Sequence, residues 1–158
     1  MRFEKLTLKS QEALASAREV AERHDHQEID VEHLLSALIG QKEGLVLPAL
    51  RQLEIDPDAL IGDIEGHLRA RPKVKGGGAE TFISQRMGQI LNAAQREAER
   101  LKDEFVSTEH LLIAIAEEAG FAGDLLRRRQ ANKEAIYQAL TKLRGSQRVT
   151  DASPEEKY

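Results

Sequence analysis

Cysteine and tryptophan are both absent from this sequence of 158 residues, and aromatic residues make up only 4% of it. The absence of cysteine excludes disulfides, thiol nucleophiles and thiolate metal ligands, and it agrees with a reducing compartment. Because aromatic side chains are scarce, the core must be built from Leu, Ile, Val and Ala. Such a composition, combined with abundant Glu, Lys, Arg and Gln, favours helices.

Long hydrophobic runs are missing as well. No uninterrupted apolar stretch is long enough to span a bilayer, and residues 1–30 lack the apolar centre of a signal peptide. A net charge of −4 argues against a nucleic-acid-binding domain. We therefore expect a cytoplasmic protein that binds neither nucleic acid nor a membrane.

The common catalytic motifs are also absent. The sequence has no Gly-x-x-x-x-Gly-Lys-Ser/Thr loop, no Gly-x-Ser-x-Gly elbow and no His-Glu-x-x-His pair. The triple glycine Gly76–Gly78 lacks the lysine and the helix start of a phosphate-binding loop, so it indicates a linker. We expect that this chain is not an enzyme and holds no cofactor and no metal.

What the sequence does contain is an internal repeat. Glu-His-Leu-Leu occurs at 32–35 and again, 77 residues later, at 109–112. The same offset aligns further identical residues, and one gap extends the match over most of the chain. The identical pairs outside the tetrapeptide are Leu14/Leu91, Ala17/Ala94, Ala21/Ala98, Glu22/Glu99, Arg23/Arg100 and Ala37/Ala114.

Apolar residues at three- and four-residue spacing predict four helices in each copy. Thr7, Asp30, Asp56, Ser84 and Asn132 are expected to cap helix N-termini. The predicted fold class is all-α, a pseudo-twofold duplicated four-helix repeat with eight helices and no sheet. The expected domain covers 1–145, with repeat one at 1–70, a linker at 71–83 and repeat two at 84–145, followed by a flexible linker at 146–158.

Several charged side chains are candidates for a site. Glu32 and Glu109 each lie in a first helical turn, where a carboxylate complements the helix dipole and can also face a ligand. The pairs with His33 and His110 suggest zinc, but adjacent helical positions point in different directions and no third ligand repeats with them. The arginine run 127–129 has no aromatic interleaving and indicates a solvated helix face rather than an RNA site.

Five segments together resemble the N-terminal domain of the Clp family of AAA+ unfoldases, and in particular its disaggregase branch, ClpB. The resemblance covers essentially the whole chain. The segments are 3–7, 25–30, 71–78, 101–112 and 148–158.

The resemblance implies a domain that captures unfolded or aggregated polypeptides and passes them to its own ATPase ring. That ring would be a homohexamer using ATP and magnesium, and working with the DnaK chaperone system, in domains that this chain lacks. Residues at positions that match the family's substrate contacts are Thr7, Asp103 and Glu109. Glu32 and Leu91 are further candidates.

The mechanism we expect is burial of apolar side chains in a shallow groove whose margin carries exposed Asp103 and Glu109 carboxylates. Two alternatives stay open. One is an adaptor-docking or phosphoarginine-docking domain of a protease-associated unfoldase, in which phosphoarginine would meet Glu32 and Glu109. The other is a small hydrolase using Glu109, His110 and Asp103, although no nucleophile or oxyanion arrangement accompanies them.

Overall fold

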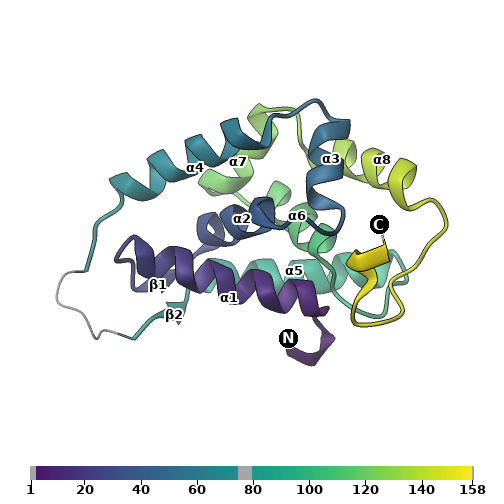
Figure 1. Ribbon diagram of the computed structural model, residues 1–158, viewed down its shortest axis with the longest axis horizontal. Coiled ribbons are helices and arrows are strands. Elements are labelled where there is room, and N and C mark those ends of the chain that lie inside the picture. Colours follow the sequence, from purple (N-terminus) through teal and green to yellow (C-terminus); the bar gives the residue numbers. More distant parts are fainter. Residues whose placement is uncertain (1–2, 75–79, 158) are drawn as a thin grey trace.

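The computed structural model describes residues 3–74 and 80–157, and helices dominate this part of the chain (Figure 1). Eight α helices occur in the described ranges, as predicted, together with two short 3-10 turns. The helices are α1 Leu8–Arg23, α2 Val31–Gly40, α3 Val46–Gln52, α4 Pro57–Ala70, α5 Gln85–Arg100, α6 Thr108–Glu117, α7 Phe121–Arg128 and α8 Lys133–Arg144, and the turns are η1 Phe3–Lys5 and η2 Pro154–Lys157.

The caps predicted from the sequence are present. Thr7, Asp56, Ser84 and Asn132 each accept a hydrogen bond from a backbone N–H in the first turn that follows, and Asp30 accepts one from Val31. Such bonds satisfy amides that have no partner inside the helix.

Helices α2 and α6 form the centre of the molecule. They carry the two Glu-His-Leu-Leu copies, and every residue of each helix except the last is buried. Helix α1 packs on α2 and α5 packs on α6, while α3 of the first copy contacts α8 of the second (Figure 1). The two copies therefore share one core.

The expectation of no sheet is wrong over four residues. Strand β1, Glu28–Ile29, pairs in parallel with strand β2, Phe82–Ile83. An isolated parallel bridge also joins Leu6 to Val106. At the 77-residue offset of the repeat, these two residues correspond to Ile83 and Ile29, so the pairing between the two copies occurs twice. Two-residue strands are too short to show the alternation that identifies a strand in a sequence.

The segment predicted as a linker is only partly described. Residues 80–83 contain β2, and the Val74 amide donates to the Asp25 carbonyl at 2.9 Å. The triple glycine Gly76–Gly78 lies outside the described residues. The division of the chain at residues 70, 84 and 145 stays a prediction.

Residues 146–158 were predicted to be flexible because they are polar, and the structure corrects this for the described part of the segment. The Val149 and Glu155 side chains are buried. The Leu8 amide donates to the Ala152 carbonyl at 2.8 Å, and the Glu104 amide donates to the Val149 carbonyl at 2.7 Å. The segment is held in part by backbone hydrogen bonds, which a hydropathy pattern does not reveal.

Candidate functional site

Thr7 caps α1, Asp103 precedes α6 and Glu109 lies in the first turn of α6, but none of the three is exposed. Their relative exposures are 0%, 7% and 0%. Asp103 accepts hydrogen bonds from Arg144 at 2.7 Å and from the Val149 amide at 2.9 Å. The prediction that Asp103 and Glu109 form the exposed margin of a groove is therefore wrong.

Asp103 is the acceptor at the centre of a buried network. Burial alone would raise the pKa of its carboxyl group, but hydrogen bonds from His110 and Arg144 outweigh burial and hold the pKa at about 2. Glu109 lies 3.5 Å from the Arg144 guanidinium. These contacts tie α6 to α8 and to the segment after α8.

Asp103, His110 and Ser107 form a chain that superficially matches a catalytic triad. His110 Nε2 lies 2.7 Å from Asp103, and its Nδ1 lies 3.1 Å from the Ser107 hydroxyl. However, Nδ1 also accepts from the Ser107 backbone N–H at 2.8 Å, which makes the histidine part of a capping box. All three side chains are buried, so the arrangement offers no base to a substrate.

The first copy supports this structural interpretation of the histidines. There His33 Nδ1 accepts from the Asp30 backbone N–H at 2.8 Å, and His33 Nε2 lies 2.9 Å from His26 Nδ1. His26 occupies the position that Asp103 has in the second copy, and Asp30 occupies that of Ser107. The first copy keeps the geometry of the histidine although the aspartate and the serine of the apparent triad are replaced there. The role that the histidine has in both copies is therefore helix capping.

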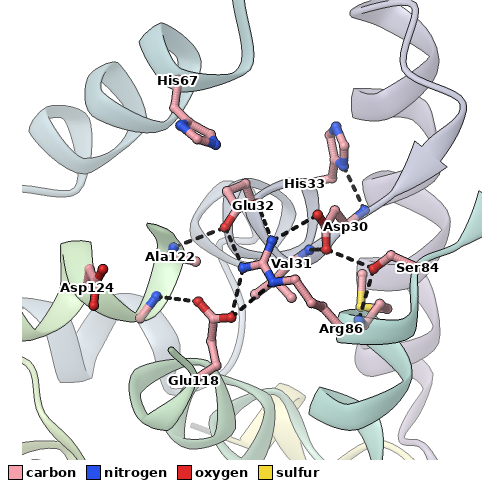
Figure 2. Close-up of polar contacts among 12 residues, drawn as sticks. Asp30, Val31, Glu32, His33, His67, Ser84, Arg86, Glu118, Ala122 and Asp124 are labelled. Atoms are coloured by element: carbon pink, nitrogen blue, oxygen red, sulfur yellow. Dashed lines mark hydrogen bonds and ion pairs between the residues drawn. The ribbon is translucent and has the colours of Figure 1, made fainter. Parts of the chain in front are cut away.

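Glu32 lies at the centre of a second polar cluster, between the two copies (Figure 2). Its carboxylate accepts from Arg86 at 3.0 and 3.1 Å, from the Ala122 amide at 3.0 Å and from Arg71. The Arg86 guanidinium also contacts Asp30 at 2.9 Å and Glu118 at 2.7 Å.

This cluster is filled by the chain itself. The Glu32 side chain is fully buried. Burial alone would raise its pKa, but the contacts with Arg86 and Arg71 outweigh burial and lower it. Glu32 is therefore ionised and already paired with guanidinium groups. Within the described residues, no group of three or more His, Asp or Glu side chains is placed to hold a metal ion.

An apolar groove of about 460 Å³ opens elsewhere, between η1, α1, β2 and α5. Leu14 and Leu91, which correspond in the repeat, line it from α1 and α5, and both are only partly buried. Phe3, Phe82 and Ile83 are 59%, 51% and 50% exposed at its margin. The full lining is Phe3, Leu6, Gln11, Leu14, Ala15, Arg18, Ile29, Thr81, Phe82, Ile83 and Leu91.

Sequence reasoning identified Leu91 but missed the three exposed side chains. Their signal was weak, because Phe82 and Ile83 lie in a segment without periodicity and Phe3 precedes the first helix. A second groove, of about 570 Å³ between α4 and α7, includes charged side chains in its lining, and Arg129 there pairs with Asp63. The groove at Leu91 is the better candidate for an apolar ligand.

A family model described as the Clp repeat (R) N-terminal domain matches residues 5–151. The chain belongs to this family. The resemblance inferred from the sequence is thereby confirmed, and the chain is an N-terminal, non-catalytic domain of a Clp protein. No helix in the described ranges is both long and apolar enough to cross a bilayer.

Among curated relatives, the chaperone protein ClpB of Bacillus cereus is 38% identical over all of this chain and 19% of its own length. ClpB of Nitratidesulfovibrio vulgaris is 42% identical over 98% of this chain and 18% of its own length. The chain thus spans about one fifth of the length of these relatives.

Solved structures share the fold. The N-terminal domain of Hsp104 from Candida albicans has a TM-score of 0.82 at 21% identity, with 95% of this chain and 98% of that one covered. The N-terminal domain of the ClpV1 ATPase from E. coli has a TM-score of 0.74 at 25% identity, with 89% and 85% covered. These likenesses confirm the predicted all-helical Clp N-terminal fold.

Proposed function

We propose that this domain captures exposed apolar segments of unfolded or aggregated polypeptides for a ClpB-type disaggregase. The observation that carries the proposal is the apolar groove at Leu91, with Phe3, Phe82 and Ile83 exposed beside it. Large exposed apolar patches are uncommon on monomeric proteins and mark interaction surfaces. The ClpB relatives supply the context of a chaperone.

The groove favours weak, sequence-tolerant binding. Burying one Leu or Phe side chain contributes about 1.5–3 kcal/mol. Ordering each residue of a flexible chain costs about 1–2 kcal/mol for the backbone alone. A groove that accepts a few side chains therefore holds an unfolded segment only briefly, which suits a domain that must release it.

The rest of the proposed assembly rests on the resemblance to ClpB-type disaggregases. The captured chain would pass to ATPase domains that form a homohexamer, use ATP and magnesium, and act with the DnaK system in the cytoplasm. In this proposal Thr7, Asp103 and Glu109 hold the starts of α1 and α6, while Leu91 touches the substrate.

Leu91→Gln tests the groove directly. It places an amide at the site of an apolar contact, so we expect the affinity for a reduced, carboxymethylated, permanently unfolded protein to fall roughly tenfold, which corresponds to about 1.4 kcal/mol. Fluorescence anisotropy of the labelled unfolded protein measures the change.

Ile61→Gln is the matched control. Ile61 is also partly buried, but it lies on α4 and outside the lining of this groove. We expect it to leave the affinity unchanged. Equal affinities of the Leu91 variant and the unmodified domain, with both folded by circular dichroism, would overturn the proposed site.

The alternative of phosphoarginine docking meets an obstacle at Glu32. A guanidinium ligand would have to displace Arg86 and Arg71, and Glu109 is also buried. We expect isothermal titration with free phosphoarginine to show no saturable binding to the unmodified domain. Saturable binding that Glu32→Gln abolishes would instead establish the alternative.

A further inference from the structure

The segment after α8 turns back across the molecule and lies against both repeats (Figure 1). Its backbone accepts from the Leu8 amide at the start of α1 and from the Glu104 amide just before α6, at 2.8 and 2.7 Å. The Val149 amide donates to Asp103 at 2.9 Å. Three separate hydrogen bonds therefore hold residues 149–152 in place.

Beyond these bonds, Glu155 fits a closed slot. It is fully buried, and its Oε2 atom accepts from the Thr7 hydroxyl at 2.7 Å and from the Thr108 amide at 3.2 Å. Gly44 forms the opposite wall, with φ of +93°, and a Cβ atom there would lie 3.1 Å from Glu155 Cγ. The slot thus combines elements from α1, α6 and the connection between α2 and α3.

The charges around the slot do not favour an ionised Glu155. Helix α6 contributes Glu109, whose two carboxylate oxygens have no hydrogen-bond partner, and Glu155 Oε1 likewise has none. Helix α8 contributes Arg144, which already pairs with Asp103 and Glu109. Thr7, Thr108 and Gly44 bring no ionisable side chain, so the charge that acts on Glu155 is that of Glu109, which has the same sign.

We propose that Glu155 is a latch that fastens residues 149–156 across the two repeats and opens when its carboxylate leaves the slot. Opening frees about eight residues, which span up to roughly 27 Å when extended. The latch therefore sets how far the domain can move from whatever follows it in the chain. Opening also uncovers Thr7 and Thr108.

The direction of the pH dependence follows from linkage. Burial first, and then the neighbouring Glu109, raise the pKa of the docked Glu155 carboxyl group, although the Thr7 and Thr108 bonds partly oppose this. The docked form binds its proton more tightly than the released form. Docking is therefore strongest at low pH and weakens as the pH rises through the pKa of docked Glu155.

Amide hydrogen exchange of Leu8 tests the latch. An amide in the first turn of a helix has no intrahelical acceptor, so the protection of Leu8 reports on its bond to Ala152. We expect Glu155→Ala to accelerate this exchange at least tenfold, while the core amide of Leu35 is unchanged. We expect Glu155→Gln, which removes the charge but keeps an acceptor, to slow the exchange of the Leu8 amide. In this variant the rate should change with pH only as the intrinsic exchange rate of an unprotected amide does.

Glu156→Gln is the matched control, because Glu156 is the exposed acid next in the chain. It should leave the Leu8 exchange rate as it is. Indistinguishable rates for the Glu155→Ala, Glu155→Gln and Glu156→Gln variants would overturn the latch. This result is independent of substrate binding, so it does not bear on the groove at Leu91.

Discussion

Replacing Arg86 with methionine is expected to lower the free energy of unfolding by about 3 kcal/mol, because it removes the guanidinium that Glu32, Asp30 and Glu118 share and leaves Glu32 and Asp30 with Arg71 alone. Glu32 is fully buried, and Asp30 and Glu118 also lie within 3 Å of the Arg86 guanidinium. Methionine keeps much of the packing of the arginine stem, so the loss reports mainly on charge. Urea unfolding followed by circular dichroism measures it.

Arg96→Met is the control for Arg86→Met, since Arg96 lies exposed on the same helix. We expect it to change stability by less than about 0.5 kcal/mol. Adding Glu32→Gln to Arg86→Met should recover part of the loss, because a neutral amide is less costly to bury than an unpaired carboxylate. A loss for Arg86→Met no larger than that for Arg96→Met would show that the cluster contributes little to stability.

Acidification from pH 6.5 to about 4 is the second large effect that we expect. Burial first, and then the Arg71 charge, lower the pKa of His33 from 6.5 to about 4. Below pH 6.5 the unfolded chain takes up a proton that the folded His33 does not accept. The stability is thus complete above pH 6.5 and falls by roughly 3 kcal/mol by pH 4, at about 1.4 kcal/mol per pKa unit.

His33→Gln tests the source of this pH dependence. Glutamine can accept from the Asp30 amide and so complete the same capping box, but it does not titrate. We expect urea midpoints of this variant to change much less between pH 6.5 and 4. As the pH falls from about 4 to about 2, both proteins should lose stability, because the unfolded chain protonates Asp103 near its ordinary pKa of 3.8, whereas the folded protein keeps it ionised down to about 2. Unchanged pH dependence in the variant would rule out His33 as the cause.

The two copies show how a repeated sequence acquires different chemistry. Glu32 and Glu109 occupy equivalent positions, and a sequence comparison treats them alike. Glu32 is paired with Arg86, whereas the residue equivalent to Arg86 in the first copy is Lys9, which pairs with Glu12 and Glu43 instead. At Glu109 the cation is Arg144, 3.5 Å away and shared with Asp103, so the two equivalent glutamates are paired with arginines from different parts of the fold.

Much of the fold could be predicted because its signals are local. A capping hydroxyl or carboxylate at Thr7 or Asp30 and the stripe of α5 depend on residues within one or two turns. The exposure of Asp103 and Glu109 could not be predicted in the same way. It depends on Arg144 and Val149, which lie about 35–45 positions further along the chain.

The sequence alone predicted the eight helices through apolar periodicity and the duplication through motif spacing, and it indicated the family through the resemblance of five segments. The tertiary structure decided which surface is open. Leu14 and Leu91 line an open groove. Glu109, in contrast, is buried beneath the segment after α8, which was expected to be flexible. Exposure depends on contacts between residues far apart in the sequence, and backbone hydrogen bonds to residues 149–152 leave no trace in side-chain hydrophobicity.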